Sequence, residues 1–321
     1  MNFLKPRIIV SRCLGFDHCR FDGQIVNSPV IERMRDFVEI ETVCPEVQIG
    51  LGIPRDSVRI IEKDGELRLM QTATSNDVTW KMREFVGSYL DEMKDVDGWI
   101  LKTRSPSCGV KDVKVYGESG SARFNKRAAG FFGGAVSERF PNTAIEDDGR
   151  LRNFRIREHF FTKLYILRAF REIKMNGKMR DLIKFHSQNK YLLMAYNQTE
   201  LRNLGPIVAN SQNRPFQEII TLYEYHMLNA LKNIPRRPAT INVLQHVFGY
   251  FSKDLNVNER RYFLDELDKY RQNKIPLSVP TSILKSWLLR FDVDYLRDQT
   301  FFQPFPEELM DVADSGQGKN Y

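Results

Sequence analysis

Short apolar runs alternate with segments of helical spacing along the first 150 residues. The apolar runs are rich in β-branched residues, which is typical of buried strands. They lie at 7–14, 38–43, 98–102 and 143–146. Between them, apolar residues spaced three or four apart predict helices at 28–37, 75–93 and 128–140. Since strands that alternate with helices form parallel sheets covered on both faces, this half is predicted to be a three-layer α/β domain with a mainly parallel sheet. Asp64 and Gly65, between two alternating runs, also predict a β-hairpin over 58–71.

After Gly149 the pattern becomes helical throughout, with prolines between the segments. The helices are predicted at 155–176, 180–196, 198–209, 216–233, 240–251, 258–272 and 281–289. The second half is therefore expected to be all-α. The predicted divisions are an α/β domain at 1–150, a connecting helix at 151–180, an all-α domain at 181–310 and a disordered polar tail at 311–321.

The composition of the 321-residue chain is ordinary for a globular protein, with 42% hydrophobic and 28% charged residues. No run of about 18 apolar residues is present, so no transmembrane helix is expected. The apolar stretch near the N-terminus lacks a small-residue cleavage site and is predicted to be a strand. We therefore expect a cytoplasmic protein.

The positive charge is unevenly distributed along the chain. Of 48 Lys and Arg and 41 Asp and Glu in total, residues 1–150 carry 22 and 23, which leaves 26 and 18 for the rest. The excess in the second half indicates a polyanionic partner for that half.

The four cysteines all lie in the first third of the chain. Cys13, Cys44 and Cys108 each come after a predicted strand, and Cys19 lies in the loop after the first strand. Because the carboxyl ends of parallel strands meet at one edge of a sheet, three thiols from three strands are expected to lie close together there. Three thiolates suit a 4Fe–4S cluster with one iron left open for a substrate.

Two other interpretations of these cysteines remain open at this stage. Isolated cysteines are usually small buried hydrophobic residues. A zinc site of four cysteines is the main rival, although the spacing of Cys13 and Cys19 is not that of a zinc ribbon.

Three segments resemble the signature segments of the thiouracil desulfidase family, in the same order and spacing. They are SRCLGFDHCRFDG (11–23), CPEVQIGLGIPR (44–55) and LKTRSPSCGV (101–110). The segment from about 181 to 297, which includes LIKFHSQNKYLLMAYNQ (182–198), resembles the YbgA-type helical domain. A chain that fuses these two domains is similar to bacterial desulfidases that act on 4-thiouridine in transfer RNA.

The resemblance implies a 4Fe–4S cluster on Cys13, Cys44 and Cys108, with Cys19 as a neighbour that is not a ligand. It places the family's catalytic Glu at Glu46. The catalytic Ser falls in the Ser-Pro-Ser-Cys segment, so Ser105 and Ser107 are both candidates.

Candidate contacts to RNA are basic residues beside aromatic residues or at the predicted start of a helix. They are Lys126, Arg127, Lys184, His186, Lys190, Tyr191, Arg236 and Arg237. Lys126 and Arg127 stand directly before the helix predicted from residue 128. Arg236 and Arg237 stand in a loop bounded by prolines.

These predictions are compatible with three functions. The first is removal of sulfur from 4-thiouridine in transfer RNA, by chemistry without net electron transfer. The second is the same chemistry on free thiouracil or a small thiolated nucleoside. The third is a non-enzymatic RNA-binding protein with a structural metal.

Overall fold

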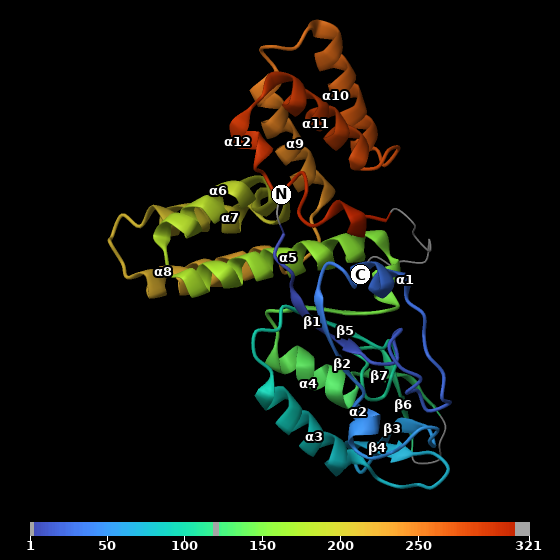
Figure 1. Ribbon diagram of the computed structural model, residues 1–321. Coiled ribbons are helices and arrows are strands. Elements are labelled where there is room, and N and C mark those ends of the chain that lie inside the picture. Colours follow the sequence, from blue (N-terminus) through green and yellow to red (C-terminus); the bar gives the residue numbers. More distant parts are fainter. Residues whose placement is uncertain (1–2, 118–121, 312–321) are drawn as a thin grey trace. The chain divides into compact units, whose positions relative to one another are not determined.

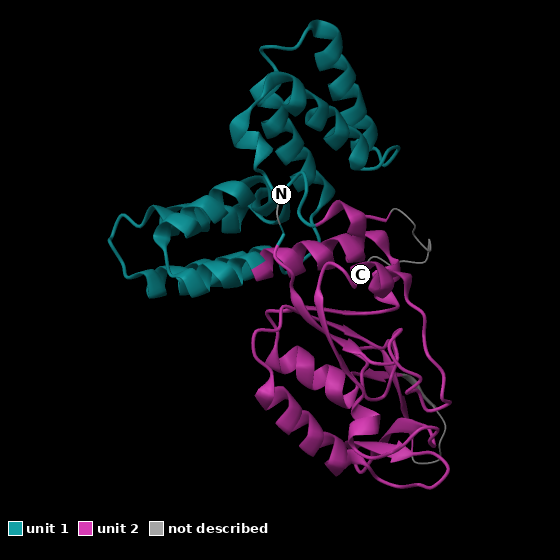
Figure 2. Ribbon diagram, in the orientation of Figure 1, with its two compact units in different colours: residues 1–3, 169–305 teal, residues 4–168, 306–321 magenta. Residues whose placement is uncertain are grey.

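The computed structural model describes residues 3–117 and 122–311, and it divides into two compact units (Figure 2). The α/β unit covers residues 4–168 and resumes at 306, whereas the helical unit covers 169–305 and the first three residues. The helix α5 (Phe154–Asn176) begins in the first unit and ends in the second. The domain bounds predicted from the sequence stay predictions. The predicted disordered tail lies outside the described residues, apart from Asp311.

The α/β unit is built on a four-stranded sheet in which all strands are parallel, in the order β2-β1-β5-β8. Its strands are β1 (Arg7–Ser11), β2 (Glu39–Val43), β5 (Gly98–Leu101) and β8 (Ala144–Asp147). All four confirm the strands predicted from the apolar runs. Strand β1 pairs with β2 and with β5. The carboxyl ends of these three strands are therefore neighbours.

Helices cover both faces of this sheet, as the predicted three-layer architecture requires (Figure 1). On one face, Trp99 of β5 packs against Phe132 of α4 (Phe131–Arg139), within a core that includes Met82 of α3 (Thr79–Glu92). On the other face, Leu164 of α5 lies so close to Gly98 that a Cβ at that glycine would be 2.8 Å from its Cδ1. The short helices of the unit are α1 (Pro29–Met34), α2 (Pro45–Gln48), η1 (Arg150–Arg152) and η2 (Glu307–Leu309).

A second, smaller sheet has the order β4-β3-β6-β7. It contains β3 (Val58–Lys63), β4 (Glu66–Gln71), β6 (Val113–Tyr116) and β7 (Ala122–Ala128). The predicted hairpin is confirmed, because Asp64 and Gly65 both have positive φ and join β3 to β4. Strands β6 and β7 were not predicted.

The second half is all-α, as predicted. Its helices are α6 (Met179–Tyr196), α7 (Gln198–Ala209), α8 (Phe216–Ala230), α9 (Arg237–Phe251), α10 (Val257–Arg271), α11 (Ser278–Phe291) and α12 (Asp294–Arg297). Asn197 caps α7, and Asn256 with Glu259 forms a capping box at α10. The rings of Phe170 and Tyr223 stack within this unit. In the part of the chain that is described, no helix is both long and apolar enough to cross a membrane.

Candidate active site

Three cysteines follow the carboxyl ends of three adjacent parallel strands. Cys13 comes two residues after β1, Cys44 directly follows β2, and Cys108 lies in the loop after β5. Because β1 lies between β2 and β5, these segments leave the sheet at the same edge. Cys44 and Cys108 are buried and Cys13 is half-buried.

Cys19 also belongs to this group of thiols. It is fully buried, and Cys13 and Cys44 are the neighbouring thiols that shift its pKa. The Cys44 Sγ also lies 3.7 Å from the carbonyl oxygen of Cys19. The chain therefore brings a fourth thiol next to the site, and the role of Cys19 as a neighbour that is not a ligand stays a prediction.

The surroundings of Cys19, Cys44 and Cys108 raise their pKa values and so favour their neutral forms in the absence of a metal. Burial raises the pKa of Cys108 to about 12. A hydrogen bond with Cys13 raises the pKa of Cys19 to about 11, and a hydrogen bond with Cys19 together with burial raises the pKa of Cys44. A metal binds thiolates, so loading the site must release protons.

The loop that carries Cys108 is shaped by Ser105 and by the start of α4. Ser105 Oγ accepts hydrogen bonds from the backbone N–H groups of Ser107 and Cys108, at 3.2 and 3.0 Å. The N–H groups of Phe132 and Gly133 both donate to the carbonyl oxygen of Ser107. The contacts of Ser105 are therefore those of a loop cap.

Two glycines make this close packing of helix on loop feasible. A Cβ on Gly133 would lie 2.4 Å from the Cys108 carbonyl oxygen, and one on Gly130 would lie 2.6 Å from that of Ser107. These contacts are with backbone atoms, which cannot swing aside as a flexible side chain can. The helix can approach the cysteine loop only with glycine at these positions.

We expect Gly133→Ala to lower the free energy of unfolding by about 2 kcal/mol, because the loop must shift to admit the methyl group. The matched control is Gly87→Ala in α3, where a Cβ would meet no heavy atom within 4 Å. The control is expected to be neutral or more stable by about 0.5 kcal/mol. Urea denaturation of both variants checks the prediction, and equal stabilities would contradict it.

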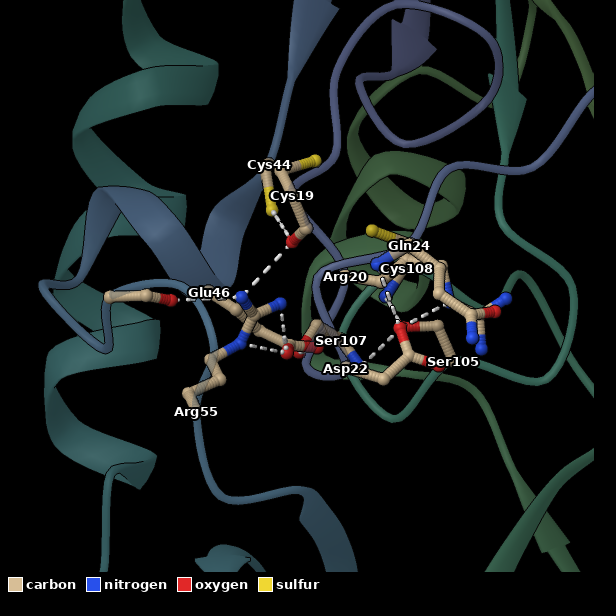
Figure 3. Close-up of polar contacts among 11 residues, drawn as sticks. Cys19, Arg20, Asp22, Gln24, Cys44, Glu46, Arg55, Ser105, Ser107 and Cys108 are labelled. Carbon is tan, nitrogen blue, oxygen red and sulfur yellow. Dashed lines mark hydrogen bonds and ion pairs between the residues drawn. The ribbon is translucent and has the colours of Figure 1, made fainter.

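Glu46 is held by side chains from two other segments of the chain (Figure 3). Ser107 Oγ donates a hydrogen bond to Glu46 Oε1 at 2.9 Å. Arg55 Nε donates a hydrogen bond to Glu46 Oε2 at 2.9 Å, and Arg55 Nη2 forms an ion pair with the same oxygen at 2.8 Å. Ser107 is fully buried, whereas the Glu46 side chain keeps 13% exposure. Of the two candidate serines, only Ser107 has a hydrogen bond to Glu46 among the described contacts.

The three cysteines supply thiol donors from three separate segments at one edge of the sheet. Thiolates are the usual protein ligands of iron–sulfur clusters, so the chemistry of these donors fits such a cluster.

The first loop contains charged side chains outside this group of thiols. Arg20 and Asp22 form an ion pair at 3.4 Å, and the Arg20 guanidinium also lies near the Phe21 ring. His18 is exposed, and its Nδ1 lies 3.3 Å from the Gly23 carbonyl oxygen. The described contacts give His18 a loop role.

Lys126 and Arg127 were predicted to stand directly before a helix, and this prediction is wrong. They lie in strand β7, and α4 begins at Phe131, so neither residue is at a helix start. The sequence pattern predicted that the helix begins at residue 128. The Gly130 backbone is extended where it packs on the Ser107 loop, so the helix begins only after it. Both side chains are exposed and form ion pairs, Lys126 with Glu62 and Arg127 with Asp112.

The candidate RNA contacts of the helical unit differ in accessibility. Lys184 and Arg236 are exposed, and Lys190 is half-buried. His186 is half-buried and bonded to the Tyr223 hydroxyl at 3.2 Å. Tyr191 is 3% exposed, with its ring against Tyr250 and Tyr295.

Arg237 differs from the predicted loop position. It is the first residue of α9, and Arg236 is the N-cap. Its guanidinium lies over the Tyr270 ring, 4.5 Å from the centroid, and donates to the Tyr270 carbonyl oxygen. The exposed candidates in this unit are therefore Lys184 and Arg236.

Arg55 and Ser11 belong to the site but were not predicted from the sequence. Ser11 Oγ accepts a hydrogen bond from the Lys102 N–H at 2.9 Å. Burial raises the pKa of the Cys108 thiol, and the hydroxyls of Ser11 and Ser105 act in the opposite direction. A serine as the last residue of an otherwise apolar strand was the available signal. For Arg55, the signal was its place at the end of the CPEVQIGLGIPR segment.

Fold and site together define a cysteine-bearing α/β domain followed by an all-α domain. A family described as 2-thiouracil desulfurase matches residues 8–148, and a family described as a protein of unknown function, DUF1722, matches residues 190–306. The chain belongs to the 2-thiouracil desulfurase family through its first domain and carries a DUF1722 domain in its second half. The resemblance predicted from the motifs is confirmed.

Individual proteins resemble each part of the chain. The uncharacterized protein YbbK of Bacillus subtilis (strain 168) is 36% identical over 109 residues, which are 32% of this chain and 72% of YbbK. The uncharacterized protein YbgA of Escherichia coli (strain K12) is 28% identical over 149 residues, 46% of this chain and 88% of YbgA. The solved structure of a [4Fe-4S]-dependent thiouracil desulfidase, TudS, is 28% identical with a TM-score of 0.34, covering 46% of this chain and 93% of TudS.

Proposed function

We propose that this chain is an enzyme that removes sulfur from a thiolated pyrimidine, with a 4Fe–4S cluster held by Cys13, Cys44 and Cys108. Membership of the 2-thiouracil desulfurase family supports the activity. The observation that carries the proposal is the hydrogen bond between Ser107 and Glu46, which joins the segments of two proposed cluster ligands. Glu46 lies two residues after Cys44, and Ser107 directly precedes Cys108.

The reaction exchanges a thiocarbonyl for a carbonyl. One water adds its oxygen to the ring carbon, the carbon–sulfur bond breaks, and sulfur leaves as hydrosulfide with no net change of electrons. When bound, a cluster with one iron free of protein ligands supplies a Lewis acid for the substrate's sulfur. The protein must supply a group that takes the proton of the water and returns one to the products.

Glu46 is the group best placed for this proton transfer. Its side chain keeps some exposure, whereas Ser107 is fully buried and donates a hydrogen bond to Glu46 Oε1. In this role Ser107 fixes the direction of the carboxylate, and Glu46 faces the water. Ser105 is proposed to stabilise the loop, since its hydroxyl oxygen accepts hydrogen bonds from two backbone N–H groups. The catalytic candidates thereby narrow to Glu46 and Ser107.

We further propose that the substrate is 4-thiouridine in transfer RNA. The excess of Lys and Arg in the second half of the chain suits a polyanion. Lys184 and Arg236 are the exposed residues of the helical unit proposed to contact RNA phosphates, and Lys126 and Arg127 are those of the α/β unit. Because sulfur must reach the buried thiol edge, the nucleotide has to be flipped out or already unpaired.

The test is a desulfuration assay with anaerobically purified, cluster-loaded protein, run in parallel on bulk transfer RNA and on free thiouracil. We expect the near-ultraviolet band of 4-thiouridine to disappear while an equal amount of hydrosulfide forms. The rate on subsaturating RNA is expected to fall steeply with added salt, because phosphate contacts release counterions. The rate on the free base should change little.

The outcomes separate the three functions. Loss of sulfur from the free base alone would favour the small-molecule desulfidase. Binding of RNA by a zinc-loaded protein, with both substrates left intact, would favour an RNA-binding protein with a structural metal.

A further inference from the structure

Arg55 is a buried cation that contacts Glu46 and two backbone carbonyl groups near the site. Its side chain is 4% exposed. Nε donates a hydrogen bond to Glu46 Oε2, Nη2 forms an ion pair with the same oxygen, and Nη1 donates to the carbonyl oxygens of Cys19 and Gly52, both at 3.0 Å. A buried guanidinium is costly unless it is paired and hydrogen-bonded, and here Glu46 supplies the opposite charge. Arg55 therefore links the Glu46 helix to the loop that carries Cys13 and Cys19.

The two carboxylate oxygens of Glu46 have different partners. A carboxylate oxygen offers two lone pairs. Oε2 faces two nitrogens of the Arg55 guanidinium, with a hydrogen bond from Nε and an ion-pair contact with Nη2 at 2.8 Å, whereas Oε1 receives one hydrogen bond, from Ser107. A further donor that approaches Glu46, such as a water or a ring N–H, is therefore expected at Oε1, which does not face the guanidinium.

The geometry of this contact requires arginine. The planar guanidinium places two nitrogens against one carboxylate oxygen while the third nitrogen donates to two backbone carbonyls. A lysine has a single nitrogen at the end of its chain, so it cannot make both sets of contacts at once. The backbone N–H of Arg55 also donates to the Phe21 carbonyl oxygen at 2.9 Å, and this contact survives a change of side chain.

We propose that Arg55 is a positioning residue that occupies Glu46 Oε2 and so makes Oε1, the oxygen shared with Ser107, the atom that handles the substrate's proton. This inference rests on the proposed function of the site. It adds a residue and an atom that the family description and the relatives' names do not specify.

The test compares Arg55→Ala with wild-type holoenzyme. We expect iron and sulfide content and KM to stay at the wild-type level. The kcat is expected to fall by about 100-fold, because the Glu46 carboxylate is no longer held in one orientation. Millimolar guanidinium should restore at least part of kcat. In the cluster-free protein, it should also raise the Tm of Arg55→Ala by refilling the vacated site.

Two other variants serve as controls. Arg68→Ala removes an arginine that pairs with Glu66 and Asp77 at the surface of the same unit, so its kcat and its response to guanidinium should match the wild type. Glu46→Gln should not be rescued by guanidinium, since its own side chain is the one altered.

Wild-type kcat in Arg55→Ala would overturn the inference while leaving the proposed function intact. If Arg55→Ala fails to fold or to hold the cluster, Arg55→Lys decides: a cluster-loaded Arg55→Lys with wild-type kcat overturns the inference, and one with wild-type KM and reduced kcat supports it. A wild-type holoenzyme that leaves every thiolated substrate intact would overturn the proposed function, and this inference with it.

Discussion

Replacement of Cys13, Cys44 or Cys108 by Ser is expected to abolish cluster binding and to reduce desulfuration to background. A serine hydroxyl is a poor ligand for iron–sulfur clusters compared with a thiolate, and each of these cysteines supplies one of three proposed attachments. The variants should be colourless after anaerobic purification. Iron and acid-labile sulfide analysis, together with the visible absorbance, checks the prediction.

The matched control for these variants is Cys19→Ser. Cys19 lies against Cys13 and Cys44 and is itself fully buried, so the control has the same surroundings and the same atomic change. It is expected to retain iron, sulfide and turnover. Loss of the cluster from Cys19→Ser would mean that the fourth thiol is a ligand and that no iron is left open.

Exchange of Glu46 for Gln is expected to lower kcat by about 1000-fold while the cluster remains in place. The amide has nearly the same shape as the carboxylate, and its single carbonyl oxygen can still accept from Arg55, but it cannot take a proton from water. Substrate binding should persist, so KM should stay close to the wild-type value. Steady-state kinetics on one preparation of known iron content gives both numbers.

Glu66→Gln is the control for this change, because Glu66 is a surface carboxylate that also pairs with an arginine, Arg68. It should behave as the wild type. Turnover by Glu46→Gln at the wild-type rate would show that the proton is handled by another group. The proposed role of Ser107 as a donor to Glu46 Oε1 would then fail as well.

Elements with strong local patterns were predictable from the sequence. The apolar strands of the parallel sheet and the β3–β4 hairpin are specified by residues adjacent in the chain, such as Asp64 and Gly65. Strand β7 has the sequence ARFNKRA, in which Lys126 interrupts a short apolar alternation, and it forms as the antiparallel partner of β6. Tertiary pairing of that kind leaves no local signal.

Some features of the candidate site were likewise predictable from the sequence, and others were not. The convergence of the three cysteines is expected from the rule that parallel strands end at one edge, so it could be predicted without contacts. The different contacts of Ser105 and Ser107 depend on how α4 packs on their loop, which requires Gly130 and Gly133. The contact between Arg55 and Glu46 depends on a loop fold that no spacing rule describes.

The content of iron and sulfide in anaerobically purified wild-type protein tests the central claim most directly. If three cysteine thiolates hold a 4Fe–4S cluster, the protein should be brown and contain about four irons and four sulfides per chain. The same preparation should contain almost no zinc. A colourless protein with one zinc per chain and no sulfide would contradict the account.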